Sequence, residues 1–546
     1  MEMKTHNDRQ ALIDPTVLSS EKSSLYLVNP CSGSNVAGLT ECIDLLGYRY
    51  LCANLSLPTL AAMVDESKFD VAICDENVDD IDFDRPCDIV GLTIYHYQRE
   101  RTFEIAREFR KRGRLVIVGG PYATQNLQSG HPLFDVVFCG EAELTWPQFL
   151  DDYLRGDFHS LYQERDHPDI TSLPPPRFDL MRNERYLLGA LQCGRGCPHK
   201  CDFCTCTVLY GRTMRYKTND QIIAELEQLH SLGYRSIFLL DDNLVGDRMR
   251  AREVVTAIRD WNESQAEPVM FSTSASIDIG TQSDLGKLFG EALITNVFVG
   301  IETPNKESLS GAGKHQNLRS DVQRDVELLH SYGVDIAAGI IVGFDDDDIS
   351  IFHRQAAFLQ ELSIPVSFAG MMLAPDGTEL KERLIREGRY LGGEEVKDHT
   401  CNTNVRPKNM TYDQLRNGYF WMMNELYDER NFLERVRGAL ARFPEPSALA
   451  RRYKPREMRD PLKFVSIMAR LLSYYITGGS TLRWLLWRYL LVILKYRRQA
   501  AVAIYWLIAF KHFREMLIRN GVLKNVDFDD TTCENRDVEE YYSATP

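Results

Sequence analysis

The chain has 546 residues, enough for more than one domain, and its hydrophobic fraction of 44% is ordinary for a globular protein with sizeable cores. Its 63 basic and 78 acidic residues give a formal net charge of −15, which argues against a general nucleic-acid-binding protein. The polar start MEMKTHNDRQ predicts no signal peptide, so we expect a reducing cytoplasmic location despite the thirteen cysteines. No apolar run has the length of a membrane-spanning helix.

Residues 24–155 alternate short apolar runs with helical patterns, after a polar start over 1–23 that we expect to be disordered. The runs predict buried parallel strands, and helices such as Thr102–Arg112 lie between them. This alternation predicts a doubly wound α/β sheet, in which ligands bind outside the carboxyl ends of the strands. The predicted strands are Ser24–Pro30, Val71–Cys74, Ile89–Ile94, Leu115–Val118 and Val136–Phe138.

A second α/β domain is predicted over 184–392, after a stiff proline-rich linker that we place at 156–183. Repeated βα units predict a full or partial βα barrel, with its active site at the carboxyl ends of the strands. The predicted strands are Tyr186–Leu191, Ser236–Leu240, Met270–Ser274, Asn296–Ile301, Ile336–Val342 and Val366–Met372, and helix Asp220–Leu232 follows the first of them.

Residues 393–546 form a predicted helical region. Within it, Pro461–Arg514 contains nine Lys or Arg and no Asp or Glu, against the acidic balance of the whole chain. Two apolar cores, Leu485–Leu494 and Ala500–Phe510, carry Trp and Tyr and are separated by basic residues. Such helices are typical of segments that lie on a membrane surface. A helical bundle folded back on the barrel explains the pattern equally well.

The most specific motif is Cys197-Pro-His-Lys-Cys201-Asp-Phe-Cys204. Three thiolates at this spacing can hold a compact iron–sulfur cluster and leave its fourth iron without a protein ligand. Gly194 and Gly196, just before the motif, let the backbone pass close to the metal. The alternatives are a structural zinc loop and buried cysteines that act as small hydrophobic residues, but no second CxxC pair follows to complete a zinc site.

This spacing, with Phe203 just before the third cysteine, resembles the signature of the radical S-adenosylmethionine (SAM) superfamily. The resemblance implies that the open iron of a [4Fe–4S] cluster chelates SAM. Reductive cleavage of SAM then releases a 5′-deoxyadenosyl radical. It also implies an external electron donor of the flavodoxin or ferredoxin type.

SAM-binding residues follow from the same resemblance and from their places at predicted strand ends. The zwitterionic methionyl group needs carboxylates, which Asp241, Asp242 and Glu302 offer. The glycine-flanked strand Gly339–Gly343 is similar to the one that runs beside SAM in the family, so we assign Gly339 and Ile341 to the site together with Phe203. An acidic residue at a strand end is also a common helix N-cap, and we expect at least one of Asp241 and Asp242 to be only that.

The first domain resembles the N-terminal cobalamin-binding domain of one branch of radical SAM enzymes, on the motifs DENV (Asp75–Val78), VGGPYAT (Val118–Thr124) and CGEAELTWPQF (Cys139–Phe149). The Asp-x-His-x-x-Gly loop that supplies a lower axial histidine is missing, and His96 and His131 are more simply surface or packing residues. The alternative is a Rossmann-like module that has lost its ligand. The resemblance implies nine cobalamin-binding residues, which are Asn29, Gly91, Thr93, Gly119, Gly120, Pro121, Tyr122, Gly140 and Glu141.

The stretch Arg406–Phe432 looks like the C-terminal helical extension of a cobalamin-dependent subgroup that includes hopanoid C-2 methylases. The resemblance implies a C-methyltransferase in which methylcobalamin gives its methyl group to a substrate radical and a second SAM remethylates the cobalt. We expect a hydrophobic small molecule or lipid as substrate, peripheral contact with the inner membrane face, and no nucleic-acid partner. The alternatives are an enzyme with the same cofactors that cyclises or rearranges carbon, and a non-catalytic cobalamin or lipid sensor.

Overall fold

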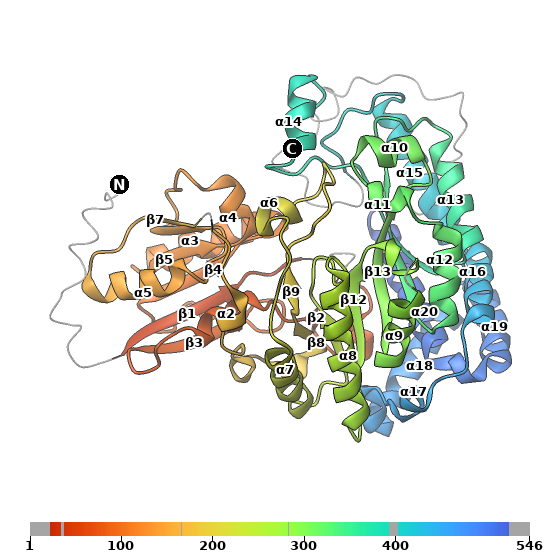
Figure 1. The fold of residues 1–546 in the computed structure, drawn as a ribbon, viewed down its shortest axis with the longest axis horizontal. Helices are drawn as coiled ribbons and strands as arrows, with labels where there is room; N and C mark the ends of the chain where they lie inside the picture. The colour runs from red at the N-terminus through yellow and green to blue at the C-terminus, as the bar shows by residue number, and fades with distance from the viewer. Residues whose placement is uncertain (1–21, 34–37, 165, 282, 393–401, 523–546) are drawn as a thin grey trace.

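Two α/β domains lie side by side, and helices of the C-terminal region cover the side of the second domain that faces away from the first (Figure 1). The computed structural model describes residues 22–33, 38–164, 166–281, 283–392 and 402–522. The predicted α/β class and the order of doubly wound sheet, partial barrel and helical region are confirmed. The expected disorder over 1–23 falls almost wholly outside the described residues, and Ser23 already opens the first strand.

The first sheet is parallel, with strand order β3-β1-β4-β5-β6-β7. Buried apolar clusters cover both of its faces, which is why its strands are near-continuous apolar runs. The last strand lies inside the range we predicted to be a linker, so part of 156–183 belongs to this sheet. The strands are β1 (Ser23–Asn29), β3 (Phe69–Asp75), β4 (Ile89–Thr93), β5 (Leu115–Gly119), β6 (Val136–Cys139) and β7 (Leu161–Gln163).

The second sheet has the order β15-β14-β13-β12-β11-β8-β2 and is parallel throughout. Its edge strand β2 (Tyr50–Cys52) comes from the first domain, where it was not predicted, and pairs Tyr50 with Tyr186. The other strands are β8 (Tyr186–Leu191), β11 (Ser236–Leu239), β12 (Met270–Ala275), β13 (Ile294–Glu302), β14 (Asp335–Val342) and β15 (Val366–Met371), and a small sheet joins β9 (Gly194–Arg195) to β10 (Arg215–Tyr216).

Helices cover the sheets, and side-chain caps start many of them. Thr218 and Thr411 each form a capping box with a glutamine three residues later. The helices of the first domain are α2 (Ser56–Ala62), α3 (Arg99–Lys111), α4 (Pro121–Asn126) and α5 (Thr145–Arg155). Those of the second are α6 (Cys206–Tyr210), α7 (Asn219–Ser231), α8 (Arg248–Ser264), α9 (Ser283–Ala292), α10 (Lys306–Gly311), α11 (His315–Leu318), α12 (Val322–Ser331), α13 (Ile351–Leu362) and α14 (Glu379–Arg386).

The C-terminal helices are part of the barrel's structure. Their buried side chains belong to the same apolar cluster as the barrel core, and the indole Nε1 of Trp506 donates a hydrogen bond of 2.8 Å to the buried Asp335. Within the described residues, no helix is both long and apolar enough to cross a membrane. The helices are α15 (Tyr412–Leu426), α16 (Glu429–Arg442), α17 (Ala448–Arg452), α18 (Pro461–Thr477), α19 (Ser480–Lys495) and α20 (Ala500–Arg519).

Candidate active site

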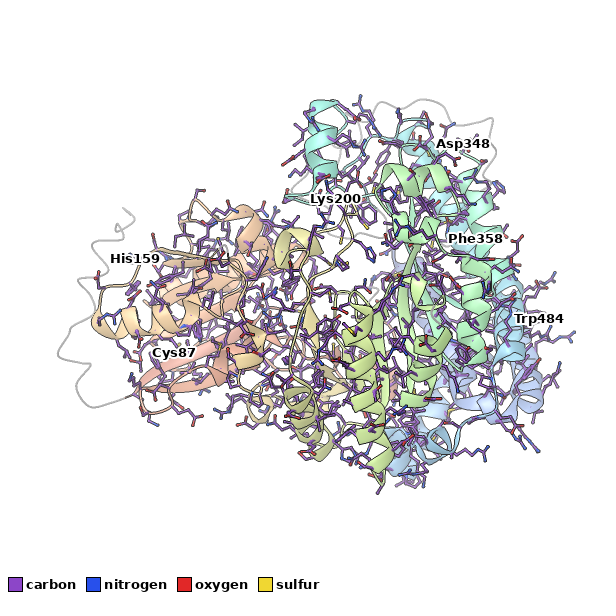
Figure 2. All side chains as sticks on the ribbon, viewed as in Figure 1. Cys87, His159, Lys200, Asp348, Phe358 and Trp484 are labelled. Atoms are coloured by element: carbon purple, nitrogen blue, oxygen red, sulfur yellow. The ribbon has the colours of Figure 1, made fainter. Side chains whose placement is uncertain are left out.

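The cysteine motif lies in a loop between β9 and α6, which we call the cluster loop (residues 196–205). Gly196 has a φ of 94°, and a Cβ at this position would lie 2.7 Å from the carbonyl oxygen of Thr213. Only glycine fits at the start of the loop without strain. Figure 2 labels Lys200, a residue of this loop, close to the junction of the two domains.

The three cysteine side chains are partly exposed, as ligands of an added group must be. Amide Nδ2 of Asn243 lies 3.9 Å from Cys197 Sγ, and amide Nε2 of Gln316 lies 3.7 Å from Cys201 Sγ, so donors face two of the sulfurs. Burial raises the pKa of the Cys201 thiol to about 11, so a bound cation is needed to hold it as thiolate. The donor set therefore fits an iron–sulfur cluster.

The described residues contain no group of three His, Cys, Asp or Glu side chains placed to hold a single metal ion. A mononuclear zinc site at the cluster loop would need such a group. A [4Fe–4S] cluster does not, because each cysteine binds a different iron.

Asp241 and Asp242, at the end of β11, support the chain that leads into the cluster loop. Asp241 accepts a hydrogen bond of 3.1 Å from the backbone N–H of Cys193, and Asp242 accepts one of 3.2 Å from that of Gly196. Burial raises the pKa of Asp241 to about 7, and its Oδ1 has no hydrogen-bond partner among the described residues. The expectation that one of the two only caps a helix is wrong, because Asp247 caps the helix that follows.

Glu302 ends β13 in a left-handed backbone conformation with a φ of 65°, which is costly for a residue other than glycine. Its buried carboxylate forms an ion pair with the ammonium of Lys314. The Lys314 ammonium also lies 5.9 Å from the ring centroid of Phe203. Burial raises the pKa of the Cys201 thiol, and the Lys314 charge only partly opposes that rise. A hydrogen bond with Cys206 is the main cause that lowers the pKa of Cys204, and the Lys314 charge adds to it. Sequence reasoning missed Lys314, since an isolated lysine between two short helices carries no local signal.

The two residues assigned on β14 have different surroundings. Ile341 packs in an apolar cluster with Phe203 and Phe344, so it lies beside the cluster loop. A Cβ on Gly339 would lie 2.8 Å from the ring of Phe298, so this glycine makes room for a neighbouring strand's side chain. Ile341 therefore joins the cluster-loop set, whereas Gly339 has a packing reason of its own.

A cavity of about 520 Å³ lies between the carboxyl ends of the first sheet and the barrel domain, a volume typical of small-molecule and cofactor sites. Of the nine residues predicted for cobalamin, Tyr122 is not in its wall and instead packs against His96 and Phe103. The other eight line it, namely Asn29, Gly91, Thr93, Gly119, Gly120, Pro121, Gly140 and Glu141. The barrel domain contributes Gln192, Arg195, Tyr210, Lys217, Leu240 and Asp242.

Asn29 anchors a polar part of the cavity wall. Its Oδ1 accepts hydrogen bonds of 2.8 Å from Thr93 Oγ1 and 3.1 Å from Gln98 Nε2, while its Nδ2 donates to Asp75 at 3.0 Å. The rest of the wall is richer in aromatic residues than the sequence led us to expect. Sequence reasoning missed four tyrosines there, which are Tyr50, Tyr95, Tyr97 and Tyr210.

Glu141 joins the two domains across this cavity. Its carboxylate, at the end of β6, accepts hydrogen bonds of 2.6 Å from Arg195 and 2.7 Å from Arg215, and it also contacts His167 at 2.7 Å. Arg195 pairs in addition with Glu143 at 2.6 Å. The buried carboxylates of Glu141 and Glu143 in the first domain thus hold Arg195, which directly precedes the cluster loop.

Comparisons with known proteins agree with this geometry. Residues 191–354 match the radical SAM superfamily, and residues 378–522 match a domain of unknown function (DUF4070). An uncharacterized methyltransferase of Synechocystis sp. is 33% identical over 72% of this chain and 74% of its own length. The hopanoid C-2 methylase of Rhodopseudomonas palustris is 31% identical over 58% of this chain and 60% of its own length.

The cobalamin-dependent SAM radical enzyme OxsB, solved with aqua-cobalamin and SAM bound, has the same fold with a TM-score of 0.57. It is 15% identical, and the likeness covers 93% of this chain and 82% of that one. Fold and cysteine loop together define a radical SAM enzyme. The chain belongs to the methyltransferase branch of that superfamily, which contains the relatives named above.

Proposed function

We propose that this protein transfers a methyl group to an unactivated carbon of a hydrophobic small molecule or lipid. The observation that carries the proposal is one cavity with walls from both domains. Asp242 and Arg195 reach it from the side of the cluster loop, and Gly91 and Gly120 reach it from the carboxyl ends of the first sheet. A substrate there would contact both the radical-generating domain and the domain that carries the methyl group.

The family's cofactors divide this chemistry. When bound, the [4Fe–4S] cluster supplies the electron that cleaves SAM, and cobalamin carries the methyl group. We propose that Cys197, Cys201 and Cys204 hold the cluster. Near it, the carboxylates of Asp242 and Glu302 would bind the methionyl ammonium and a ribose hydroxyl, and Lys314 would bind the methionyl carboxylate. Phe203 and Ile341 would pack beside the bound SAM, Asp241 would hold the loop in place, and Gly339 would leave space along β14.

Cobalamin would occupy the cavity against the eight first-domain residues that line it. Neither His96 nor His131 lines the cavity. The side chain of His96 hydrogen-bonds to Gln125 at 2.8 Å, and that of His131 stacks on Phe103. These two histidines of the first domain therefore make their contacts outside the cavity wall. This supports cobalamin held without a histidine from that domain.

The substrate class rests on the aromatic wall and on the relatives. Tyr50, Tyr95, Tyr97 and Tyr210 offer flat apolar surface to a hydrophobic molecule. Relatives act on a hopanoid and, in Chlorobaculum tepidum, on bacteriochlorophyllide d, as their names state. The proposal includes a flavodoxin-type or ferredoxin-type electron donor, no nucleic-acid partner, and a cytoplasmic location with peripheral contact at the inner membrane face. A reaction that cyclises or rearranges carbon with the same cofactors is the second candidate, which the shared cofactor set allows.

Product mass separates the two candidates. The anaerobically purified enzyme, reconstituted with cluster and cobalamin, is given lipid extract from a strain that lacks its gene, together with SAM that carries a deuterated methyl group. A product that gains one labelled methyl group in place of hydrogen supports methylation. A product that loses hydrogen and gains no label supports cyclisation and overturns the proposal.

A further inference from the structure

Two helices of the C-terminal region expose apolar side chains to solvent. Nine of the fifteen large apolar residues that are exposed in the described parts of the chain lie from Met458 to Ile518. We define the α18–α19 face by the six of them that lie on these two helices and are each more than half exposed. They are Leu462, Val465 and Ile476 on α18, and Trp487, Leu491 and Leu494 on α19.

These side chains are not needed to close the bundle. On α19, Trp487, Leu491 and Leu494 follow the spacing of one helix face, while Leu485 and Tyr489 are buried on another. The buried Tyr489 hydroxyl donates to the carbonyl of Ala503 at 2.7 Å, so the inner face is already packed on α20. The outer face therefore has a use other than folding the described chain.

Exposed cations flank the apolar residues. Arg488, Lys495 and Arg497 are exposed, and none forms an ion pair with a carboxylate within the described residues. Between 461 and 514 the sequence has nine basic residues and no acidic one. An apolar stripe bordered by cations is the pattern of a helix that lies in an anionic bilayer surface.

We propose that the α18–α19 face docks on an anionic phospholipid surface. A second copy of the chain fits less well, because a symmetric interface would bring the cations of one face against those of the other. This docking would provide the membrane contact that the proposed function includes, and it does not depend on the methyl-transfer chemistry.

The docking face and the cavity lie on different sides of the molecule. In Figure 1, α18 and α19 lie on the side of the barrel away from the first sheet, whose strand ends line the cavity, and α18 also contacts Asp44 and Tyr48 in the segment that leads to β2. Figure 2 labels Trp484 on that outer side. The contact therefore anchors the protein, and the substrate reaches the cavity from elsewhere.

Vesicle flotation of the full chain tests the proposal. Vesicles are phosphatidylcholine alone or phosphatidylcholine mixed with phosphatidylglycerol. We expect binding to the mixed vesicles that weakens as salt rises. Each basic residue near such a surface is worth about fivefold in partitioning, about 1 kcal/mol, so a variant with R488Q, K495Q and R497Q should bind at least about tenfold more weakly. A variant with W487S, L491S and L494S should lose binding as well.

The matched control is M249S with I385S, which removes two exposed apolar side chains on helices of the barrel domain. It should bind vesicles like the wild type, and circular dichroism should show all variants folded. Three outcomes overturn the proposal. One is equal flotation of wild type and both face variants; another is dimerisation through the face in light scattering without lipid. The third is vesicle binding by a chain that ends at Val522 when the full chain does not bind. That result would mean that residues 523–546, and not a membrane, are the partner of the α18–α19 face. None of these outcomes bears on the methylation assay.

Discussion

The carboxylate of Glu141 accepts a hydrogen bond of 2.6 Å from Arg195, and this contact joins the end of β6 to the residue before the cluster loop. The side chains of Glu141 and Arg195 are 4% and 11% exposed, so their charges are largely removed from water. Such a pair stabilises only while both partners are present. The first domain and the cluster loop therefore hold each other in one arrangement, with the cavity between them.

Replacing Glu141 by glutamine should lower the free energy of unfolding by roughly 1–3 kcal/mol, because Arg195 and Arg215 lose a buried counter-charge while Glu143 still pairs with Arg195. Urea denaturation measures the change. The control E108Q removes a surface partner of Lys111 and Arg112 and should leave stability unchanged. Equal stability of E141Q and E108Q would show that the contact does not join the domains energetically.

The pairing of Glu141 with Arg195 makes the free energy of unfolding depend on pH. Burial acts to raise the pKa of Glu141, but hydrogen bonds from Arg215 and Arg195 outweigh it and hold the pKa below its usual range. A carboxyl with a lowered folded-state pKa stabilises fully above its unfolded pKa of about 4.3 and loses that contribution as pH falls through the folded value. The stability difference between wild type and E141Q should therefore be constant near neutrality and shrink below about pH 4.

Asp335 should have the opposite pH dependence. Burial raises its pKa to about 7, although Trp506 and Asn296 donate hydrogen bonds to it. The folded state therefore binds a proton more tightly than the unfolded chain, so stability falls as pH rises from about 4 to about 7. D335N, which stays neutral, should match the wild type near pH 4 and exceed it at pH 8. A D335N variant less stable than the wild type at pH 8 would contradict the prediction. Thermal unfolding at both pH values measures it.

Replacing Cys197, Cys201 and Cys204 together by alanine should remove the brown chromophore and SAM cleavage from the anaerobic protein. The reason is that the three thiolates are the cluster's protein ligands. The control C87A removes a buried thiol of the first sheet domain, which Figure 2 labels far from the cluster loop, and should keep its iron. A full iron complement in the triple variant would rule out the assignment.

Cobalamin bound to the protein should show no nitrogen ligand from the first domain's histidines. His96 and His131 lie outside the cavity wall and contact Gln125 and Phe103 instead. Electron paramagnetic resonance of the Co(II) form should lack the three-line nitrogen splitting of an imidazole. If that splitting is present and survives in H96A but not in H131A, His131 is the ligand and the prediction fails.

Local sequence patterns were enough to predict most elements and the cluster loop. The strand predicted at Tyr186–Leu191 has those bounds in the structure, and Ile89–Ile94 differs from β4 by one residue. Strand periodicity, glycine turns and cysteine spacing are properties of neighbouring residues, so they can be read without tertiary contacts. The same holds for the assignment of the cysteine motif to the radical SAM superfamily.

Contacts between residues far apart in the chain could be decided only by the tertiary structure. They include the pairing of β2 with β8, the pairing of Glu302 with Lys314, and the reach of Glu141 to Arg195. The sequence left open whether the C-terminal helices fold back, and packing places α20 on the barrel while leaving one face of α19 exposed. A short strand or a charged residue could pair with many partners in the chain, and which partner it pairs with depends on how the whole chain packs.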